Sequence, residues 1–307
     1  MGRRRSADDV SGVLIVDKPV GMTSHDVVQV VRRAVGQSRV GHTGTLDPAA
    51  TGVLVVCLGR ATRLVQFLQV GTKTYAARMV LGVETDSQDA DGQVIATVDA
   101  SHVDERSLCE ALTRFQGPIE QIPPMVSAVK VDGERLHEKA RRGETVERDA
   151  RQVTVHDLVL DAFEPGARPE AAFLVTCSAG TYVRTIAHDV GQALGVGGSL
   201  VGLRRLANGP FTSDEAHDLD TIRAAAEDGS LAERFLPIEA AVARALPAVA
   251  IEDDDVALRL TQGARAEAQQ IEGPYALTYG GRLLGIYEDT GDAAKAALVW
   301  TRPEELS

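Results

Sequence analysis

The stretch GHTGTLDPAATG, residues 41–52, decides how the rest of this sequence is interpreted. It carries a single carboxylate, Asp47, directly before Pro48 and between glycines on either side. Proline fixes its own φ and restricts the preceding residue to extended conformations, while glycine lets another backbone or a ligand approach closely. Such a stretch can present one acid on a rigid loop. An aspartate before a proline is also a common helix start, and these residues alone leave both interpretations open.

Apolar runs and amphipathic segments alternate on both sides of this stretch. The patterns predict strands at residues 12–17, 53–58, 73–83, 153–160, 171–178 and 200–206, a helix capped by Ser24, and helices that begin at Arg106 and Thr181. Residues 153–160 and 171–178 are expected to pair as antiparallel strands. Beyond Pro247, a short helix at residues 254–261 precedes a further group of strands. This mixture predicts an α+β protein with a smaller, β-rich C-terminal part.

Six blocks of sequence together resemble the TruB family of tRNA pseudouridine synthases. They are DKPVGMTSH (17–25), GHTGTLDPAATGVL (41–54), KTY (73–75) followed by LG (81–82) and TD (85–86), QIPPM (121–125), CSAGTYVRTI (177–186) and LRRL (203–206). They occur in the family's order and span residues 12 to about 210, so the resemblance is highly specific.

The resemblance implies a fold and a domain organisation. The expected fold is the pseudouridine-synthase fold, a mixed, mainly antiparallel central sheet flanked by helices, together with a small PUA-like C-terminal domain. Residues 1–11 are expected to form a flexible tail and residues 12–245 the catalytic domain, in which residues 117–143 grip RNA. Residues 246–307 are expected to form the PUA-like domain.

The resemblance also implies an activity, the isomerisation of uridine-55 in the T loop of tRNA to pseudouridine. The reaction breaks a C–N glycosidic bond and rejoins the base through carbon, after the base has been flipped out of the folded loop. By resemblance, Asp47, Tyr75 and Arg184 are catalytic, and the sequence leaves open whether Asp47 attacks C1′ of the sugar or C6 of the base. The sequence contains no phosphate-binding loop, dinucleotide fingerprint or metal-ligand spacing, so we expect neither a cofactor nor a metal.

Arg184 supplies an argument for its own partner that does not depend on the resemblance. It lies in the first turn of the helix expected from Thr181, away from the apolar stripe of that helix. A cation is disfavoured there by the helix dipole and requires an anionic partner. A carboxylate enclosed beside a base has its pKa raised by desolvation, and a neighbouring cation counteracts this rise. The partner of Arg184 could be a carboxylate or a phosphate; the resemblance assigns the cation beside Asp47 to Arg184, so we expect an ion pair between these two residues.

The remaining site residues are assigned by resemblance. Tyr75 is expected to stack on the flipped base and to accept the C5 proton late in the reaction, although a half-buried sheet tyrosine has the same pattern. His42 is expected to fill the space left in the T loop, and Tyr182 and Leu203 to line the uracil pocket. The residues expected to contact the RNA backbone are Lys130, Arg135, Lys139, Arg141, Arg142 and Arg205.

Three further observations concern the RNA-gripping region and its surroundings. A run of basic residues is more often a solvated surface than a binding site, so that alternative stays open for residues 135–143. Val126 and His137 depart from the family pattern, which favours aromatic residues at both positions. The acidic segment from Thr85 to Gly92 is expected to form a loop away from the RNA.

Composition limits the partners and the compartment. The net charge of −12 is shared unevenly, since residues 246–307 hold 11 acidic and 5 basic side chains, so a local basic face remains compatible with RNA. No apolar run is long enough to span a membrane, and three widely spaced cysteines predict buried free thiols in a reducing cytoplasm. We expect a monomer that binds the tRNA T arm without an obligatory protein partner. The alternatives are a tRNA-folding helper for which catalysis is secondary, and a guide-RNA-directed relative.

Overall fold

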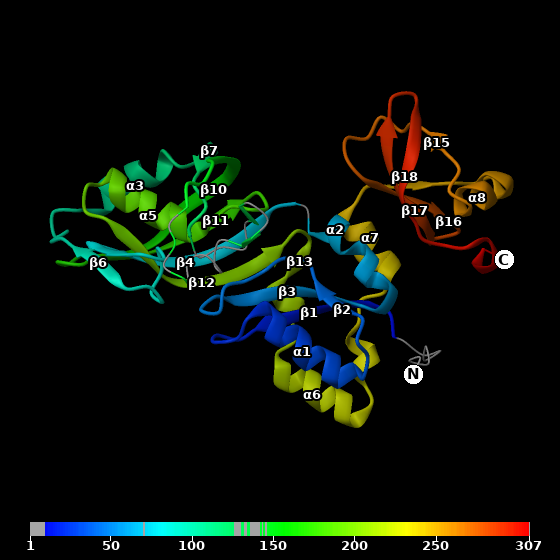
Figure 1. Ribbon diagram of the computed structural model, residues 1–307, viewed down its shortest axis with the longest axis horizontal. Coiled ribbons are helices and arrows are strands. Elements are labelled where there is room, and N and C mark those ends of the chain that lie inside the picture. The colour runs from blue at the N-terminus through cyan, green and yellow to red at the C-terminus, as the bar shows by residue number, and fades with distance from the viewer. Residues whose placement is uncertain are drawn as a thin grey trace.

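The computed structural model describes residues 10–69, 71–125, 130–131, 134–135, 142, 144 and 146–306. Its secondary structure is dominated by a large sheet with helices on both faces and by a smaller sheet near the C-terminus. The molecule is elongated, and the smaller sheet lies at one end of its long axis (Figure 1).

Nine strands of the described chain form the large sheet. They are β1 (Gly12–Lys18), β2 (Val40–His42), β3 (Thr51–Leu58), β4 (Lys73–Leu81), β7 (Gly117–Gln121), β10 (Arg151–Glu164), β11 (Glu170–Cys177), β12 (Gly198–Asn208) and β13 (Phe211–Thr212). The order is β1-β3-β12-β4-β11-β10-β7, with β2 paired to β3 and β13 to β12. Among these pairings only β3 with β12 is parallel, so the predicted mixed, mainly antiparallel sheet is confirmed.

The burial of each strand follows from what covers its two faces. Strand β3 is buried from Gly52 to Leu58, as its unbroken apolar run requires, because helical segments cover both of its faces. Strand β4 alternates instead, with Tyr75 buried and Arg78 exposed. This alternation places Tyr75 on the helix-covered face of the sheet.

Helices cover both faces of the large sheet. They are α1 (Ser24–Val35), α2 (Val65–Leu68), α3 (Glu105–Thr113), α5 (Val183–Ala193), α6 (Leu219–Asp228) and α7 (Ile238–Ala245), with short 3₁₀ turns η1 (Gly59–Leu64), η2 (Ser213–Glu215) and η3 (Leu231–Arg234). Helices α1 and α6 lie side by side below β1, and α3 and α5 cover the other end of the sheet (Figure 1). The N-cap of α1 is Thr23, which accepts a hydrogen bond from Asp26 N, and not the predicted Ser24.

The smaller sheet contains five strands. It consists of β14 (Ala248–Ala250), β15 (Ala266–Glu267), β16 (Tyr275–Tyr279), β17 (Arg282–Thr290) and β18 (Ala293–Val299), accompanied by α8 (Asp254–Thr261) and η4 (Pro303–Glu305). Two short hairpins stand apart, β5 (Val83–Thr85) with β6 (Val94–Thr97) and β8 (Lys130–Val131) with β9 (Glu134–Arg135).

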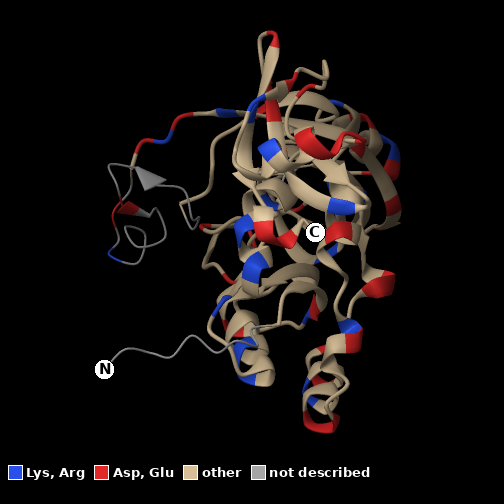
Figure 2. Ribbon diagram, turned by 90° about the vertical axis from the view of Figure 1, so that its right-hand side faces the viewer, with Lys and Arg blue, Asp and Glu red and all other residues tan. Residues whose placement is uncertain are grey.

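Trp300 joins the smaller sheet to the rest of the molecule. Its indole is 5% exposed, and it packs in a core shared with η1 and α2. The guanidinium of Arg60 stacks 4.8 Å from the ring centroid and also pairs with Glu305 at 2.8 Å. Figure 2 looks onto this end of the molecule and shows acidic and basic segments interspersed over it.

Two other expectations are settled by burial and helix length. Cys57 and Cys177 are buried free thiols as expected, but Cys109 lies on the outer side of α3 and is exposed, so the expectation was wrong for that residue. Within the part of the chain that the structure describes, we find no helix both long and apolar enough to cross a membrane.

Candidate active site

Asp47 lies in the loop that joins β2 to β3, and this loop is a turn and not a helix start. The amide of Ala50 donates to the carbonyl of Asp47 at 3.1 Å, and β3 begins directly afterwards at Thr51. The helix-start interpretation of Asp47-Pro48 is therefore wrong, and the chain presents the aspartate on a loop.

The segment before and inside α1 holds this loop from one side. The buried hydroxyl of Ser24 accepts from Leu46 N at 2.8 Å and donates to Leu46 O at 3.2 Å. The Pro48 carbonyl accepts from Gly21 N at 2.9 Å and from the ammonium of Lys18 at 3.2 Å. Burial lowers the pKa of Lys18 to about 8. Hydrogen bonds to both neighbours of Asp47 thus fix the backbone that carries it.

Arg205 holds the loop from the opposite side. Its guanidinium is 1% exposed and donates to the carbonyls of Val53 (2.6 Å), Gly44 (3.1 Å) and Thr45 (3.4 Å). The expectation that Arg205 contacts the RNA backbone is therefore wrong, because its donors bind carbonyls of the loop and are enclosed by protein. Arg204, its neighbour on β12, faces the other way and pairs with Asp17 at 2.8 Å.

Gly52 is the glycine of this stretch that the fold requires. Its φ is +99°, and a Cβ there would lie 2.2 Å from the carbonyl oxygen of Arg205, where β3 and β12 run in parallel. At Gly44 a Cβ would meet its nearest neighbours at ordinary contact distance, 3.7 Å from Lys73 Cε. The close backbone approach inferred from the glycines therefore occurs at Gly52.

Arg184 joins two carboxylates at the start of α5. Its Nη2 lies 3.3 Å from Asp47 Oδ2, so the predicted ion pair is present, and its Nη1 lies 3.0 Å from Asp89 Oδ2. The Arg184 side chain is 5% exposed and Asp89 14%, whereas Asp47 keeps 45% of its side-chain surface accessible. Of the two carboxylates, Asp47 is the one that a ligand can reach.

Asp89 was missed in the sequence, where the acidic segment from Thr85 to Gly92 was expected to form a loop away from the RNA. The residue before it, Gln88, has a φ of +66°, a conformation that non-glycine residues rarely adopt. The side-chain oxygen of Gln88 accepts from Thr185 Oγ1 at 2.8 Å, and its carbonyl accepts from Leu200 N at 3.0 Å. These contacts join the Asp89 loop to α5 and β12. A second acceptor for Arg184 was foreseeable, because one carboxylate cannot engage all the donors of a buried guanidinium.

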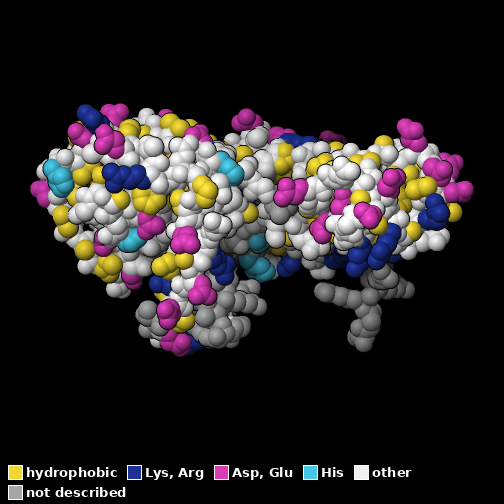
Figure 3. All heavy atoms as spheres, turned by 90° about the horizontal axis from the view of Figure 1, so that it is seen from above, with side chains coloured by type: hydrophobic (Ala, Val, Ile, Leu, Met, Phe, Trp, Pro, Cys, Tyr) yellow, Lys and Arg dark blue, Asp and Glu magenta, His cyan; other side chains and the backbone are white. Residues whose placement is uncertain are grey.

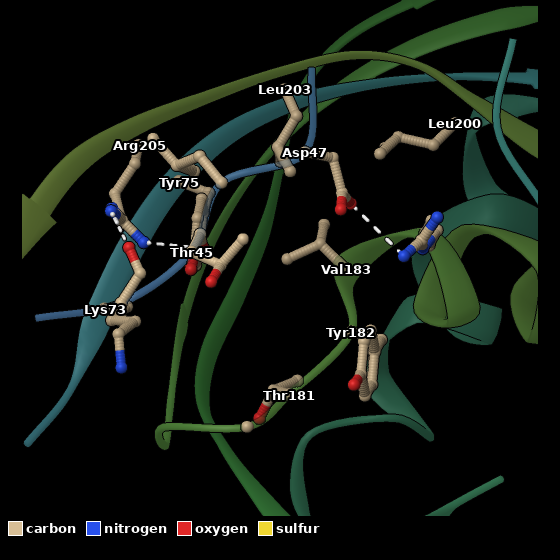
Figure 4. Close-up of a pocket in the computed structure, with 14 residues that line it drawn as sticks. Thr45, Asp47, Lys73, Tyr75, Thr181, Tyr182, Val183, Leu200, Leu203 and Arg205 are labelled. Carbon is tan, nitrogen blue, oxygen red and sulfur yellow. Dashed lines mark hydrogen bonds and ion pairs between the residues drawn. The ribbon is translucent and has the colours of Figure 1, made fainter. Parts of the chain in front are cut away.

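A cavity of about 230 Å³ opens beside Asp47. It is lined by Gly44, Thr45, Leu46, Asp47, Lys73, Tyr75, Gly180, Thr181, Tyr182, Val183, Arg184, Leu200, Leu203 and Arg205. Figure 4 shows the labelled side chains of this set converging from the loop, from β4, from β12 and from the start of α5. The expected catalytic and pocket residues Tyr75, Tyr182 and Leu203 all line it, with Asp47 and Arg184.

Electrostatic surroundings set the protonation of the cavity's acids. Burial raises the pKa of Asp47 above its ordinary value, Arg184 opposes that rise, and the charge of Asp89 adds to it. Burial also raises the pKa of the Tyr75 hydroxyl, with Arg205 opposing. Tyr75 is therefore protonated at neutral pH, which suits a stacking face better than a resting proton acceptor.

His42 and Tyr182 are held by neighbouring polar groups. His42 lies at the end of β2, outside the cavity lining, and its Nδ1 accepts from Gly44 N at 3.2 Å. Burial, reinforced by Arg205, lowers the pKa of His42, so it is neutral at pH 7. The Tyr182 amide donates to Gln121 Oε1 at 3.0 Å, and Gln121 Nε2 donates back to the Tyr182 carbonyl at 3.2 Å. Gln121 was not expected to support the site.

The expected RNA-gripping residues fall largely outside the described chain. Lys139, Arg141, Val126 and His137 lie outside the described residues, and for Lys130 and Arg135 the backbone alone is described, in β8 and β9. Arg142 is exposed and pairs with Glu134 at 2.6 Å and with Glu144 at 2.7 Å. In the view of Figure 3, basic side chains are interspersed with acidic ones, and several lie along the lower edge.

Comparison with known families gives two matches that together cover residues 32–243. A model described as TruB family pseudouridylate synthase (N terminal domain) matches residues 32–183. A second, described as tRNA pseudouridylate synthase B C-terminal domain, matches residues 184–243.

Individual relatives agree with these matches. A protein named tRNA pseudouridine synthase B from Symbiobacterium thermophilum is 49% identical over 88% of this chain and 85% of its own length. Its namesake from Thermobifida fusca is 44% identical over 94% of this chain and 98% of its own length. Among solved structures, a chain of a Cbf5-Nop10-Gar1 complex superposes with a TM-score of 0.74 at 29% identity, covering 96% of this chain and 86% of that one. A chain from an H/ACA RNP bound to a substrate RNA containing 2'-deoxyuridine superposes with a TM-score of 0.72 at 27% identity, over 95% and 86%.

Proposed function

The chain belongs to the TruB family of pseudouridylate synthases, and from this premise we propose that it converts uridine-55 in the tRNA T loop to pseudouridine. The observation that carries the proposal is the accessible Asp47 carboxylate beside a cavity, held by Arg184 at 3.3 Å. An enclosed nucleophile must stay ionised at neutral pH, and the arginine opposes the effect of burial on its pKa.

The cavity supports a division of labour among its residues. The flipped uracil stacks on Tyr75 and packs against Leu203 and Tyr182, which returns part of the cost of extruding it. Asp47 then acts as the nucleophile, and Arg184 holds its carboxylate in place and in its charged form. His42, which is neutral and lies outside the cavity, is available to the space that the flipped base leaves in the T loop.

We also propose a domain organisation, a set of RNA contacts and an oligomeric state. Residues 12–245 form the catalytic domain and residues 246–307 the smaller C-terminal domain. The basic residues of segment 117–143 contact the RNA backbone, and for Arg142 such contacts would compete with its two acidic partners. The protein acts as a monomer in the cytoplasm on the T arm of tRNA, without a cofactor or an obligatory protein partner.

The decisive experiment uses the purified full-length protein alone on an unmodified tRNA transcript. Pseudouridine at position 55, detected by base-specific chemical labelling and primer extension, is the expected result. A transcript with cytidine at position 55 and the Asp47→Asn variant should both give no product, while that variant still binds tRNA. Product at another uridine, or substantial turnover by Asp47→Asn, would contradict the proposal.

The structural neighbours motivate one alternative, modification directed by a guide RNA, because two of them come from Cbf5 and H/ACA assemblies. The experiment above separates the two, since a guide-dependent enzyme would leave the transcript unmodified when no second RNA is added. A tRNA-folding role, the other alternative, would survive in the Asp47→Asn variant and would be measured as restored tRNA function in a deletion strain.

A further inference from the structure

One side of the cavity beside Asp47 carries positively charged side chains that have no part in the reaction as proposed above. Lys73 is the first residue of β4, two positions before Tyr75, so both side chains project from the same face of the sheet. Figure 4 shows Lys73 and Arg205 together, across Tyr75 from Asp47. The Lys73 side chain extends past Gly44, where an added Cβ would lie 3.7 Å from Lys73 Cε and 3.8 Å from Arg205 Nη1.

Lys73 is buried without a carboxylate. The residue is 8% exposed, and its ammonium makes one long hydrogen bond, 3.4 Å, to the carbonyl of Gln69. Within the described chain no acidic side chain forms an ion pair with Lys73 or with Arg205. Burial lowers the pKa of Lys73, and the positive charge of Arg205 lowers it further. Burying an ammonium without an acidic partner costs folding free energy. In this fold the Lys73 ammonium, buried in that way, belongs to the wall of the cavity.

The proposed reaction creates a negative charge inside the same cavity. When the N1–C1′ bond breaks, its electron pair stays with the uracil, delocalised from N1 onto O2 and O4. The base then rejoins C1′ through C5, the proton on C5 is released to water, N1 takes up a proton from water, and Asp47 is regenerated as a free carboxylate. No oxidant or reductant takes part. A preorganised cation near those oxygens stabilises the detached base most strongly when its charge is greatest.

We propose that Lys73 is a catalytic residue whose ammonium contacts a carbonyl oxygen of the flipped uracil and stabilises the base as it detaches from C1′. This inference rests on the proposed function and adds a third charged group to Asp47 and Arg184. A base carbonyl fits better than a phosphate, because Lys73 lies in the cavity wall with 8% of its surface accessible, whereas phosphates stay on the outside of the flipped nucleotide. Arg205 supports Lys73 from behind, since its own donors are engaged by loop carbonyls.

The test compares Lys73→Met with wild type on a tRNA transcript that carries 5-tritiated uridine, measuring tritium release in a single turnover at saturating enzyme. Loss of one preorganised transition-state donor typically lowers the rate about 100- to 1000-fold, and we expect a decrease in this range. The dissociation constant for tRNA should change by less than about threefold, and its dependence on salt should stay the same. With 5-fluorouridine as target, which has no C5 hydrogen to release, N1–C1′ cleavage is followed by mass spectrometry of the digested RNA, and the Lys73→Met defect should shrink because fluorine itself stabilises the anionic base.

Two variants control for lost structure. Lys295→Met removes an exposed lysine of β18 and should leave rate and binding unchanged. Lys73→Arg keeps the charge and should recover part of the lost rate, which a purely structural defect would not allow.

Three outcomes would overturn the inference. The first is a wild-type rate in Lys73→Met. The second is an unchanged rate with weakened binding and a salt slope reduced by about 0.7–0.9, which would identify a phosphate contact. The third is a fluorouridine defect as large as the uridine defect. Failure of the proposed function itself is distinguishable, because wild type would then release no tritium from position 55.

Discussion

Replacing Arg184 by lysine tests the arrangement on which the proposed mechanism depends. The two terminal nitrogens of Arg184 engage separate carboxylates, Asp47 at 3.3 Å and Asp89 at 3.0 Å. A single ammonium on a flexible stem does not reproduce this fork, so Arg184→Lys must give up one contact or weaken both. Asp47 is then held less firmly, and Asp89 remains as an uncompensated neighbour.

The size of the effect follows from the contact that is lost. A hydrogen bond to a charged group contributes about 1.5–3 kcal/mol, and each 1.36 kcal/mol of barrier changes a rate tenfold. Because 45% of the Asp47 side chain is accessible, solvent screening places the loss in the lower half of that range. We expect a single-turnover rate about 10- to 50-fold below wild type, with tRNA binding nearly unchanged.

The assay is tritium release from 5-tritiated uridine at saturating enzyme, with binding measured separately by filter retention. Arg78→Lys is the matched control, since Arg78 pairs with Glu170 at 2.6 Å on exposed surface and should keep its rate within about twofold. An Arg184→Lys enzyme as fast as wild type would refute the reasoning, because the fork would then contribute nothing. A loss confined to tRNA binding would refute it equally.

Two further predictions concern pH and stability. With ionised Asp47 as the active form, the rate falls as the pH drops through the pKa of Asp47. The negative charge of Asp89 raises this pKa. Asp89→Asn removes that charge, so the acidic limb of the rate profile should move to lower pH. A shift to higher pH would contradict the assignment. Trp300→Ala removes a buried indole between the two sheets and should lower the unfolding free energy by about 3–5 kcal/mol. The measurement is the denaturant midpoint, which should decrease. Val94→Ala, at a position 61% exposed, is the control and should change the midpoint little. An unchanged midpoint for Trp300→Ala would show that this contact does not stabilise the molecule.

Periodicity predicted much of the fold because the core strands follow it closely. The apolar run in β3 and the alternation in β4 are direct consequences of two-sided and one-sided burial, and both were legible from residue type. Helix α8 was predicted at its observed limits, since Asp253 caps it and the acidic first turn suits the helix dipole. The start of α1 was misplaced by one residue, because Thr23 and Ser24 are both good caps.

The sequence could not show which of the two adjacent arginines of β12, Arg204 or Arg205, faces the site. In the LRRL segment of β12, neighbouring side chains face opposite sides, so one of Arg204 and Arg205 must point inward. Nothing in the segment says which, and the register of β12 against β4 shifts at Arg205. Asp89 was missed for a different reason, since an acidic, turn-rich segment usually faces solvent. A left-handed Gln88 directs it inward, and residue type does not predict that conformation.

The net charge of the whole chain did not indicate the charge around the cavity, and the buried charged side chains explain why. The described chain buries four charged side chains, Lys18, Lys73, Arg184 and Arg205, and all four are basic. Each of them contacts the loop that carries Asp47 or lies beside it. Charges in a poorly solvated wall act more strongly than the same charges in water, so the cavity is locally positive although the whole chain carries −12. An anion that forms at the cavity meets this local field, while the acidic excess lies on solvated surface where salt screens it.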